Sequence, residues 1–165
     1  MLAPDGKMRL TDVADTEQVL RLVQSIPSIK SIEVRKALTD EWDKSGVKQG
    51  EEYALLTDLM SQTWSGMTTR EYKRHKGLKK ENLRDNMTNT ELVLNMLAEV
   101  AAADISIARQ PSGLRESAVV AKEGAKAAKV AREQIERSTG KPAVSKLNAK
   151  KTRQRLLEEG RNADG

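Results

Sequence analysis

The sequence of 165 residues contains no cysteine and no phenylalanine, and its aromatic residues are two tryptophans and two tyrosines. Without cysteine, the chain has no disulfides, no thiol catalysis and no cysteine-based zinc site. Large side chains supply most of the area that a core buries, so the shortage of aromatic residues limits the core. We therefore expect a modest helical body with a small core and extended arms.

The chain also lacks the motifs of most enzymes and membrane proteins. No run approaches the roughly 20 apolar residues that span a bilayer, and no signal peptide precedes the first polar residues. Neither glycine-rich phosphate-binding motif occurs, and no carboxylate cluster has calcium-loop spacing. The one histidine, His75, lies inside a cluster of cations, with no Ser-His-Asp spacing around it. We expect a cytoplasmic protein without catalysis, metal, cofactor or membrane attachment, although a nuclease built from scattered carboxylates stays open.

Positive charge is abundant and concentrated in one block. The chain has a net charge of +5, and seven cations stand against two acids between Arg70 and Arg84, a balance that is also +5. Such clusters bind phosphate backbones, although many charge runs serve only solubility. Tyr72 lies inside this block, where packing against Trp64 is a simpler role than stacking on a base. The predicted nucleic-acid-binding residues are Arg70, Lys73, Arg74, Lys76, Lys79, Lys80 and Arg84.

Capping residues divide this part of the chain into helices. Thr68 with Glu71, and Thr88 with Glu91, are capping-box pairs that start helices. Gly77 is suited to end the first of them, since glycine adopts the left-handed conformation without steric cost. The pattern predicts a short basic helix to about residue 76 and a long one from 88 to about 108. The expected buried face of the long helix is Leu92, Met96, Val100 and Ala103.

Other segments have helical periodicity and complete an all-α fold of about five or six helices. An amphipathic helix is expected over residues 15–26, and a second over 29–45 with Ile32, Leu38 and Trp42 buried. Residues 51–64 carry an apolar stripe at three- and four-residue spacing and end before Gly66. The stripe consists of Tyr53, Leu56, Leu59, Met60 and Trp64.

Residues 114–138 form the most regular segment. Alternating spacings of four and three residues give a heptad seam that is mostly alanine and is broken once by Arg132. The seam consists of Leu114, Ala118, Ala121, Ala125, Ala128, Arg132 and Ile135. A solvated alanine-rich helix explains the pattern, and a helix that docks on a partner or pairs in a homo-oligomer explains it too. The candidate partner-helix residues are Ala118, Ala121, Ala125, Ala128 and Ile135.

Beyond this helix the chain is again basic. Residues 138–157 contain six cations and no acid, which favours a flexible or transiently helical tail that follows a phosphate backbone or only aids solubility. The six are Lys141, Lys146, Lys150, Lys151, Arg153 and Arg155.

The segment HKGLKKENLRDNMTNTELVLNMLAE, residues 75–99, resembles the C-terminal region of the DNA-damage-inducible protein D family. Members of that family carry an N-terminal Bro-N, or phage antirepressor-like, domain. Residues 6–28 look like the end of such a domain, and ALTDEW (37–42) and TGKPAVSKLN (139–148) look like further family landmarks. The resemblance covers most of residues 6–150 and indicates a shortened member that lacks most of the Bro-N domain.

This resemblance implies a part in the DNA-damage (SOS) response or in prophage-type regulation, by binding DNA or a recombinase–DNA filament. An antirepressor-like module that binds a repressor-type protein, and a non-functional fragment of a larger gene, are the alternatives. The expected organisation is a Bro-N remnant over 1–28, a helical body over 29–110 with the basic block at 68–87, the alanine-rich helix over 111–140, and a basic flexible tail over 141–165.

Overall fold

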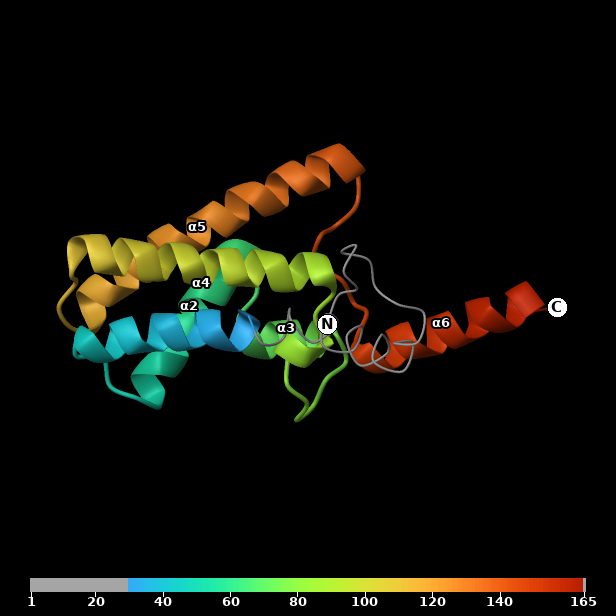
Figure 1. Ribbon diagram of the computed structural model, residues 1–165, viewed down its shortest axis with the longest axis horizontal. Helices are drawn as coiled ribbons and strands as arrows, with labels where there is room; N and C mark the ends of the chain where they lie inside the picture. Colours follow the sequence, from blue (N-terminus) through green and yellow to red (C-terminus); the bar gives the residue numbers. More distant parts are fainter. Residues whose placement is uncertain (1–29, 165) are drawn as a thin grey trace, which may run out of the picture. The chain divides into compact units, whose positions relative to one another are not determined.

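A computed structural model describes residues 30–164 of the chain (Figure 1). The chain divides into two compact units, residues 1–33 and 34–165, and the second contains nearly all of the described part. Within residues 30–164 there are six α-helices, one short 3-10 helix and no strand, so the predicted all-α fold is confirmed. The helix expected over residues 15–26 lies outside the described residues.

The helices follow the predicted boundaries closely. They span residues 30–44, α2 (Glu51–Ser65), α3 (Thr69–His75), the 3-10 helix η2 (Arg84–Asn86), α4 (Asn89–Arg109), α5 (Gly113–Thr139) and α6 (Ala149–Asp164). The last of these lies in the segment expected to be a flexible or transiently helical tail, which is a regular helix from Ala149 to Asp164.

The helix ends use the capping residues that the sequence indicates. The Thr68 side chain accepts a hydrogen bond from the backbone N–H of Glu71, at 3.2 Å, and begins α3. Thr88 and Glu91 form a complete capping box at the start of α4. Gly77, just beyond α3, has a positive φ of 71°, as its predicted role at the end of that helix requires.

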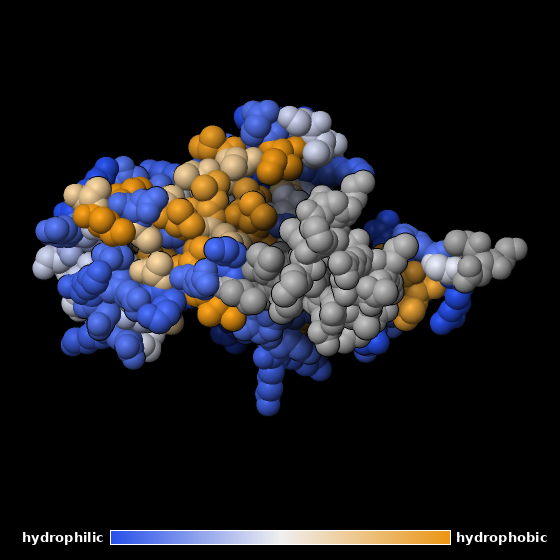
Figure 2. All heavy atoms as spheres, in the orientation of Figure 1, coloured by the Kyte–Doolittle hydropathy of each residue, from blue (hydrophilic) through white to orange (hydrophobic). Residues whose placement is uncertain are grey.

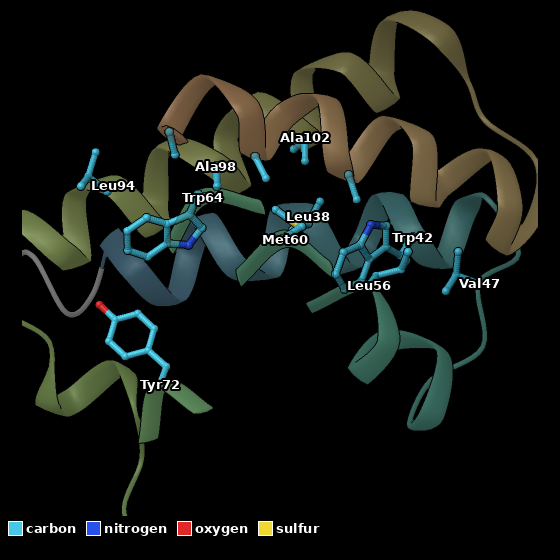
Figure 3. Packing of buried hydrophobic residues seen from close by; sticks show 14 residues of the cluster. Leu38, Trp42, Val47, Leu56, Met60, Trp64, Tyr72, Leu94, Ala98 and Ala102 are labelled. Atoms are coloured by element: carbon cyan, nitrogen blue, oxygen red, sulfur yellow. The ribbon is translucent and has the colours of Figure 1, made fainter. Parts of the chain in front are cut away.

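The core lies where α5 packs against both α2 and α4. Figure 3 shows two tryptophans, Trp42 and Trp64, among the aliphatic residues of this cluster. Its buried members are Leu38, Trp42, Val47, Leu56, Met60, Trp64, Tyr72, Leu94, Ala98, Ala102, Ala103, Ala121, Ala125 and Ala128. Burial of Leu38, Trp42 and Trp64 was expected and is confirmed, whereas Ile32 was expected to be buried and is 69% exposed.

The buried face of α4 differs from the predicted one. Of the expected set only Ala103 is buried, and Val100 is 41% exposed. The face that enters the core instead contains Leu94, Ala98 and Ala102. The physical reason is the neighbouring helix: a β-carbon built on Gly124 of α5 would lie 2.5 Å from the Ala102 backbone nitrogen. Two backbones can approach this closely only through small residues, so the larger side chains of α4 turn outward.

The alanine seam of α5 is occupied within its own chain. Ala121, Ala125 and Ala128 are fully buried against the core, and Leu114, Ala118 and Ile135 pack partly against it. Most of the predicted partner-helix surface therefore docks on α2 and α4 of its own chain, whereas Ala118 and Ile135 remain partly exposed. The one charged seam residue has a local role, since Arg132 Nη1 donates to the Ser65 carbonyl at the C-terminus of α2, at 3.5 Å.

Some apolar side chains remain on the surface. On the face shown in Figure 2, hydrophobic residues gather over α4 and α5, and the exposed ones include Val93 and Ile107 of α4 and Val119 and Val130 of α5. No helix within residues 30–164 has the length and apolar character that a bilayer crossing requires.

Candidate nucleic-acid interface

The structure divides the seven predicted nucleic-acid-binding cations into two groups. Arg70, Arg74, Lys79 and Lys80 are exposed, and Lys73 is partly exposed. The other two, Lys76 and Arg84, turn toward carboxylates inside the protein. Five cations of the block therefore remain at the surface, on α3 and on the segment that follows it.

Lys76 is fully buried, which corrects its predicted place in a basic surface. Its Nζ lies 2.7 Å from Glu91 Oε1 and donates a second hydrogen bond to the Leu147 carbonyl, at 2.6 Å. A buried ammonium must be paired, because leaving water costs several kcal/mol. The carboxylate and the carbonyl supply that pairing, so Lys76 joins three segments of the chain and leaves no charge for an external phosphate.

Tyr72 completes this buried network. Its hydroxyl donates to Glu91 Oε2, and its ring lies 6.1 Å from the ring of Trp64, as the favoured packing role required. Burial raises the pKa of Tyr72 far above its ordinary value, and the hydrogen bond to Glu91 and the negative charge of Glu91 raise it further. The tyrosine therefore stays neutral and holds the carboxylate in place for Lys76.

Arg84 is held in a second cluster around Glu99, which is 3% exposed. Its guanidinium binds both carboxylate oxygens, with Nη2 2.6 Å from Oε1 and Nη1 2.9 Å from Oε2. Arg35 approaches the same carboxylate at a longer 3.4 Å and donates to Thr57 Oγ1 at 2.7 Å. This bidentate geometry orients Arg84 toward the protein interior, which corrects its predicted role as a surface cation.

The two acids of the block each bind a group that is close to them in the sequence. The Glu71 carboxylate lies beside the Thr68 hydroxyl, at 3.1 Å, and Glu81 Oε2 accepts the backbone N–H of Lys79, at 2.6 Å. Hydrogen bonds from the backbone N–H groups of Glu81 itself and of Lys79 lower the pKa of the Glu81 carboxyl. Neither carboxylate forms an ion pair with a lysine or arginine side chain of the block in the described part of the chain.

The second cationic segment docks beside the first. Asn148 Nδ2 donates to the Lys76 carbonyl at 2.9 Å, and the backbone N–H of Ala149 donates to Asn86 Oδ1 at 3.0 Å. A β-carbon built on Gly77 would be 4.0 Å from Lys151 Nζ. We call the surface cations on the two sides of this contact the basic junction: Arg70, Lys73, Arg74, Lys79, Lys80, Lys146, Lys150, Lys151, Arg153 and Arg155.

The helix that follows this contact carries its cations on exposed positions. Asn148 Oδ1 accepts the backbone N–H of Lys151, at 2.9 Å, as an N-cap does. The first turn of α6 contains no acid. The two leucines in the middle of the helix, Leu156 and Leu157, are 64% and 55% exposed. In Figure 1, α6 leaves the helical body after its first residues. It therefore presents side chains to solvent and contributes little to the core.

The tertiary contacts of three residues at this site, Glu91, Glu99 and Asn148, were not predicted from the sequence. Glu91 was interpreted only as a capping residue, although it shares the three- and four-residue spacing of the buried positions Leu94 and Ala98. Glu99 has the same spacing to the buried positions Ala102 and Ala103, but a carboxylate at such a position is not expected to be buried. Asn148 lies in the motif TGKPAVSKLN, where an asparagine before a basic helix is an N-cap signal.

Comparisons with family models, with curated proteins and with solved structures found no match to this chain. The membership in the DNA-damage-inducible protein D family that the sequence motifs indicate stays a prediction.

Proposed function

We propose that this protein binds nucleic acid without catalysis, through the phosphate backbone, at the basic junction. The observation that carries the proposal is the docking of residues 147–149 onto Lys76 and Asn86. This contact joins two cationic segments that are about 70 residues apart in the sequence. A cluster assembled from both segments neutralises more phosphates than either segment alone, and each neutralised phosphate adds affinity by releasing counterions.

The position of the cations on α6 supports the same proposal. Lys150 and Lys151 lie in the first turn of the helix, where the positive end of the helix dipole disfavours cations. Their mutual repulsion and that of Lys79 and Lys80 add to this unfavourable arrangement. A bound phosphate backbone relieves both effects, because its negative charge is attracted to the cations and to the helix N-terminus alike.

The biological setting of the proposal comes from the sequence resemblance. It is DNA-damage-inducible (SOS) or prophage-type regulation, in which the protein binds DNA or a recombinase–DNA filament. Phosphate contacts position a protein on nucleic acid without reading bases, so the junction supports binding that tolerates many sequences.

The test is fluorescence anisotropy of labelled single- and double-stranded DNA at two salt concentrations. The junction variant carries Lys79→Gln, Lys80→Gln, Lys150→Gln and Lys151→Gln, all at exposed positions. The matched control also removes four charges at exposed positions, by Lys48→Gln, Lys122→Gln, Lys126→Gln and Lys129→Gln. We expect wild-type binding to weaken with salt, the junction variant to bind at least about tenfold more weakly with a shallower salt slope, and the control to change little.

Two results would contradict the proposal. If neither DNA binds at low salt, the junction has no nucleic-acid role and the search moves to protein partners. If both variants lose affinity equally, net charge alone accounts for binding and the junction is not a site.

A further inference from the structure

A cavity of about 360 Å³ lies beside the Glu99 cluster. Its walls come from the helix over residues 30–44, from α2, α3 and α4, and from the segment that includes η2. The lining residues are Arg35, Thr57, Met60, Ser61, Thr69, Lys73, Asn82, Leu83, Arg84, Met87, Asn95 and Glu99. Its volume falls at the lower end of the range of about 300–1,000 Å³ that small-molecule sites occupy.

The lining that residues 30–164 contribute is positively charged. It contains three cations, Arg35, Lys73 and Arg84, and one carboxylate, Glu99. Both oxygens of Glu99 are bound by Arg84, so Arg35 retains only the longer contact with it, at 3.4 Å. Arg35 is nevertheless held firmly, because Thr57 accepts one of its hydrogen bonds and its guanidinium lies 5.1 Å from the ring centre of Trp42.

The guanidinium of Arg35 lies in surroundings that disfavour its charge. Burial lowers the pKa of Arg35, the attraction of Glu99 opposes this, and repulsion by Arg84 lowers the pKa further. Within residues 30–164, Glu99 is the one carboxylate paired with Arg35, and Arg84 shares it. An additional anion in the cavity stabilises Arg35 directly, since arginine binds oxyanions through its planar fork of donors.

Three more donors at the cavity have no partner within residues 30–164. Lys73 Nζ forms no ion pair or hydrogen bond there, and neither does the amide of Asn95. The Asn82 Oδ1 atom accepts from the Asp85 backbone, at 3.1 Å, and fixes the side chain, while its Nδ2 atom has no acceptor in the same range. These residues come from α3, from the segment before η2 and from α4, and all three line the same cavity.

We propose that this cavity binds a phosphate monoester, with Arg35 and Lys73 contacting the phosphate and Asn82 and Asn95 donating further hydrogen bonds. A phosphate suits this set because it presents several acceptor oxygens and a charge that two cations can share. The apolar part of the lining, Met60, Leu83 and Met87, is available to the organic group of the ester.

Two sources supply this chemistry: a free mononucleotide, or the phosphorylated end of a nucleic-acid strand. The inference does not depend on the basic junction. Only Lys73 belongs to both sites, so the tests below leave it unchanged.

The test is isothermal titration calorimetry of the full chain with inorganic phosphate, with adenosine 5′-monophosphate, and with a short single-stranded oligonucleotide carrying either a 5′-phosphate or a 5′-hydroxyl. Asn95→Asp places a negative charge at the cavity with almost no change of shape. Arg35→Gln removes a phosphate contact and leaves Glu99 paired with Arg84. Asn162→Asp introduces the same charge change at an exposed position of α6, outside the cavity lining, and is the control.

We expect saturable binding of at least one phosphate probe, weakened about tenfold or more by Asn95→Asp and by Arg35→Gln and unchanged by Asn162→Asp. A preference for the 5′-phosphorylated over the 5′-hydroxyl strand, lost in Asn95→Asp, identifies the strand end as the source. Binding of the mononucleotide with equal affinity for the two strands identifies the free nucleotide. Absence of saturable binding at millimolar concentrations, or binding that both cavity variants leave intact, overturns the proposal.

The experiments distinguish failure of the cavity proposal from failure of the proposal that the basic junction binds nucleic acid. Loss of salt-dependent DNA binding in the Lys→Gln junction variant, with phosphate binding retained, contradicts neither proposal. Retained DNA binding without any phosphate-monoester binding overturns the cavity alone.

Discussion

Lys76 and Glu91 form an ion pair in which both side chains are fully buried, with Nζ 2.7 Å from Oε1. The glutamate belongs to the capping box of α4 and also accepts the hydroxyl of Tyr72. The lysine extends the network to the Leu147 carbonyl. A residue that composition places among surface cations thus holds α3, α4 and the segment before α6 together.

We predict that Lys76→Met lowers the free energy of unfolding by about 3–5 kcal/mol, because removing one partner leaves the other charge buried without compensation. Urea denaturation followed by circular dichroism measures this. Lys79→Met, at an exposed position three residues along the chain, is the control and should change stability by less than about 0.5 kcal/mol. Equal effects of the two substitutions would mean that Lys76 is solvated in solution.

The second prediction concerns alkaline pH. Because the folded state raises the pKa of Tyr72 above the ordinary value of 10.0, the unfolded chain loses this proton first as pH rises. Stability from Tyr72 is therefore fully present below pH 10 and declines above it, by up to about 1.4 kcal/mol per pH unit.

Tyr72→Phe removes this dependence. The variant should be about 1–3 kcal/mol less stable than wild type at neutral pH, since Glu91 loses a donor, and its stability should fall less steeply in the alkaline range. Denaturation at a series of pH values tests both. Parallel curves for the two proteins above pH 10 would show that Tyr72 titrates normally.

The helix boundaries were predictable because their signals are local. The Thr68 and Thr88 caps and the glycines after α2 and α3 each act within a few residues of their own positions. The tertiary contacts of a side chain have no such local signal. Lys76 meets its second acceptor at Leu147, 71 residues away, and no feature of the basic block itself distinguishes Lys76 from Lys79.

The buried face of α4 was mispredicted for a related reason. Hydrophobicity alone favours burying Val100 over Ala102, yet Val100 is 41% exposed and Ala102 is fully buried. Helix spacing decides the outcome, because α5 approaches α4 closely at Gly124 and only small residues fit between them. In a sequence poor in large apolar residues, alanine and glycine positions determine the packing, and the largest side chains are a weaker guide.

The third prediction follows from this close approach. Gly124→Ala gains about 1 kcal/mol of helix propensity, but its new methyl group meets the Ala102 backbone at 2.5 Å. The net effect should be a loss of about 1–3 kcal/mol in unfolding free energy, as overpacking costs in a core.

Gly160→Ala in α6 is the matched control, because a β-carbon there has no neighbour within 4 Å. Thermal and urea denaturation should show the loss only for Gly124→Ala, while Gly160→Ala should retain global stability and raise the helical content of α6. A gain in stability from Gly124→Ala would mean that α4 and α5 lie further apart than the structure places them.

The last prediction distinguishes two contributions to DNA affinity: the charge of the basic junction and the docking of α6 beside the first cationic segment. Asn148 caps α6 through Oδ1 and holds it to the Lys76 carbonyl through Nδ2, at 2.9 Å in both contacts. Asn148→Ala removes both contacts without changing any charge. The α6 cations then have to be positioned during binding, so DNA affinity should fall several-fold. The slope of affinity against salt should stay the same, because the number of phosphate contacts is unchanged.

Fluorescence anisotropy at several salt concentrations measures affinity and slope together. Asn162→Ala, at an exposed position of the same helix, should bind as wild type does. The Lys→Gln junction variant differs from Asn148→Ala in a defined way, since it should lower the slope as well as the affinity. Wild-type affinity in Asn148→Ala would show that the two cationic segments bind independently, and the docked arrangement of α6 would then have no part in recognition.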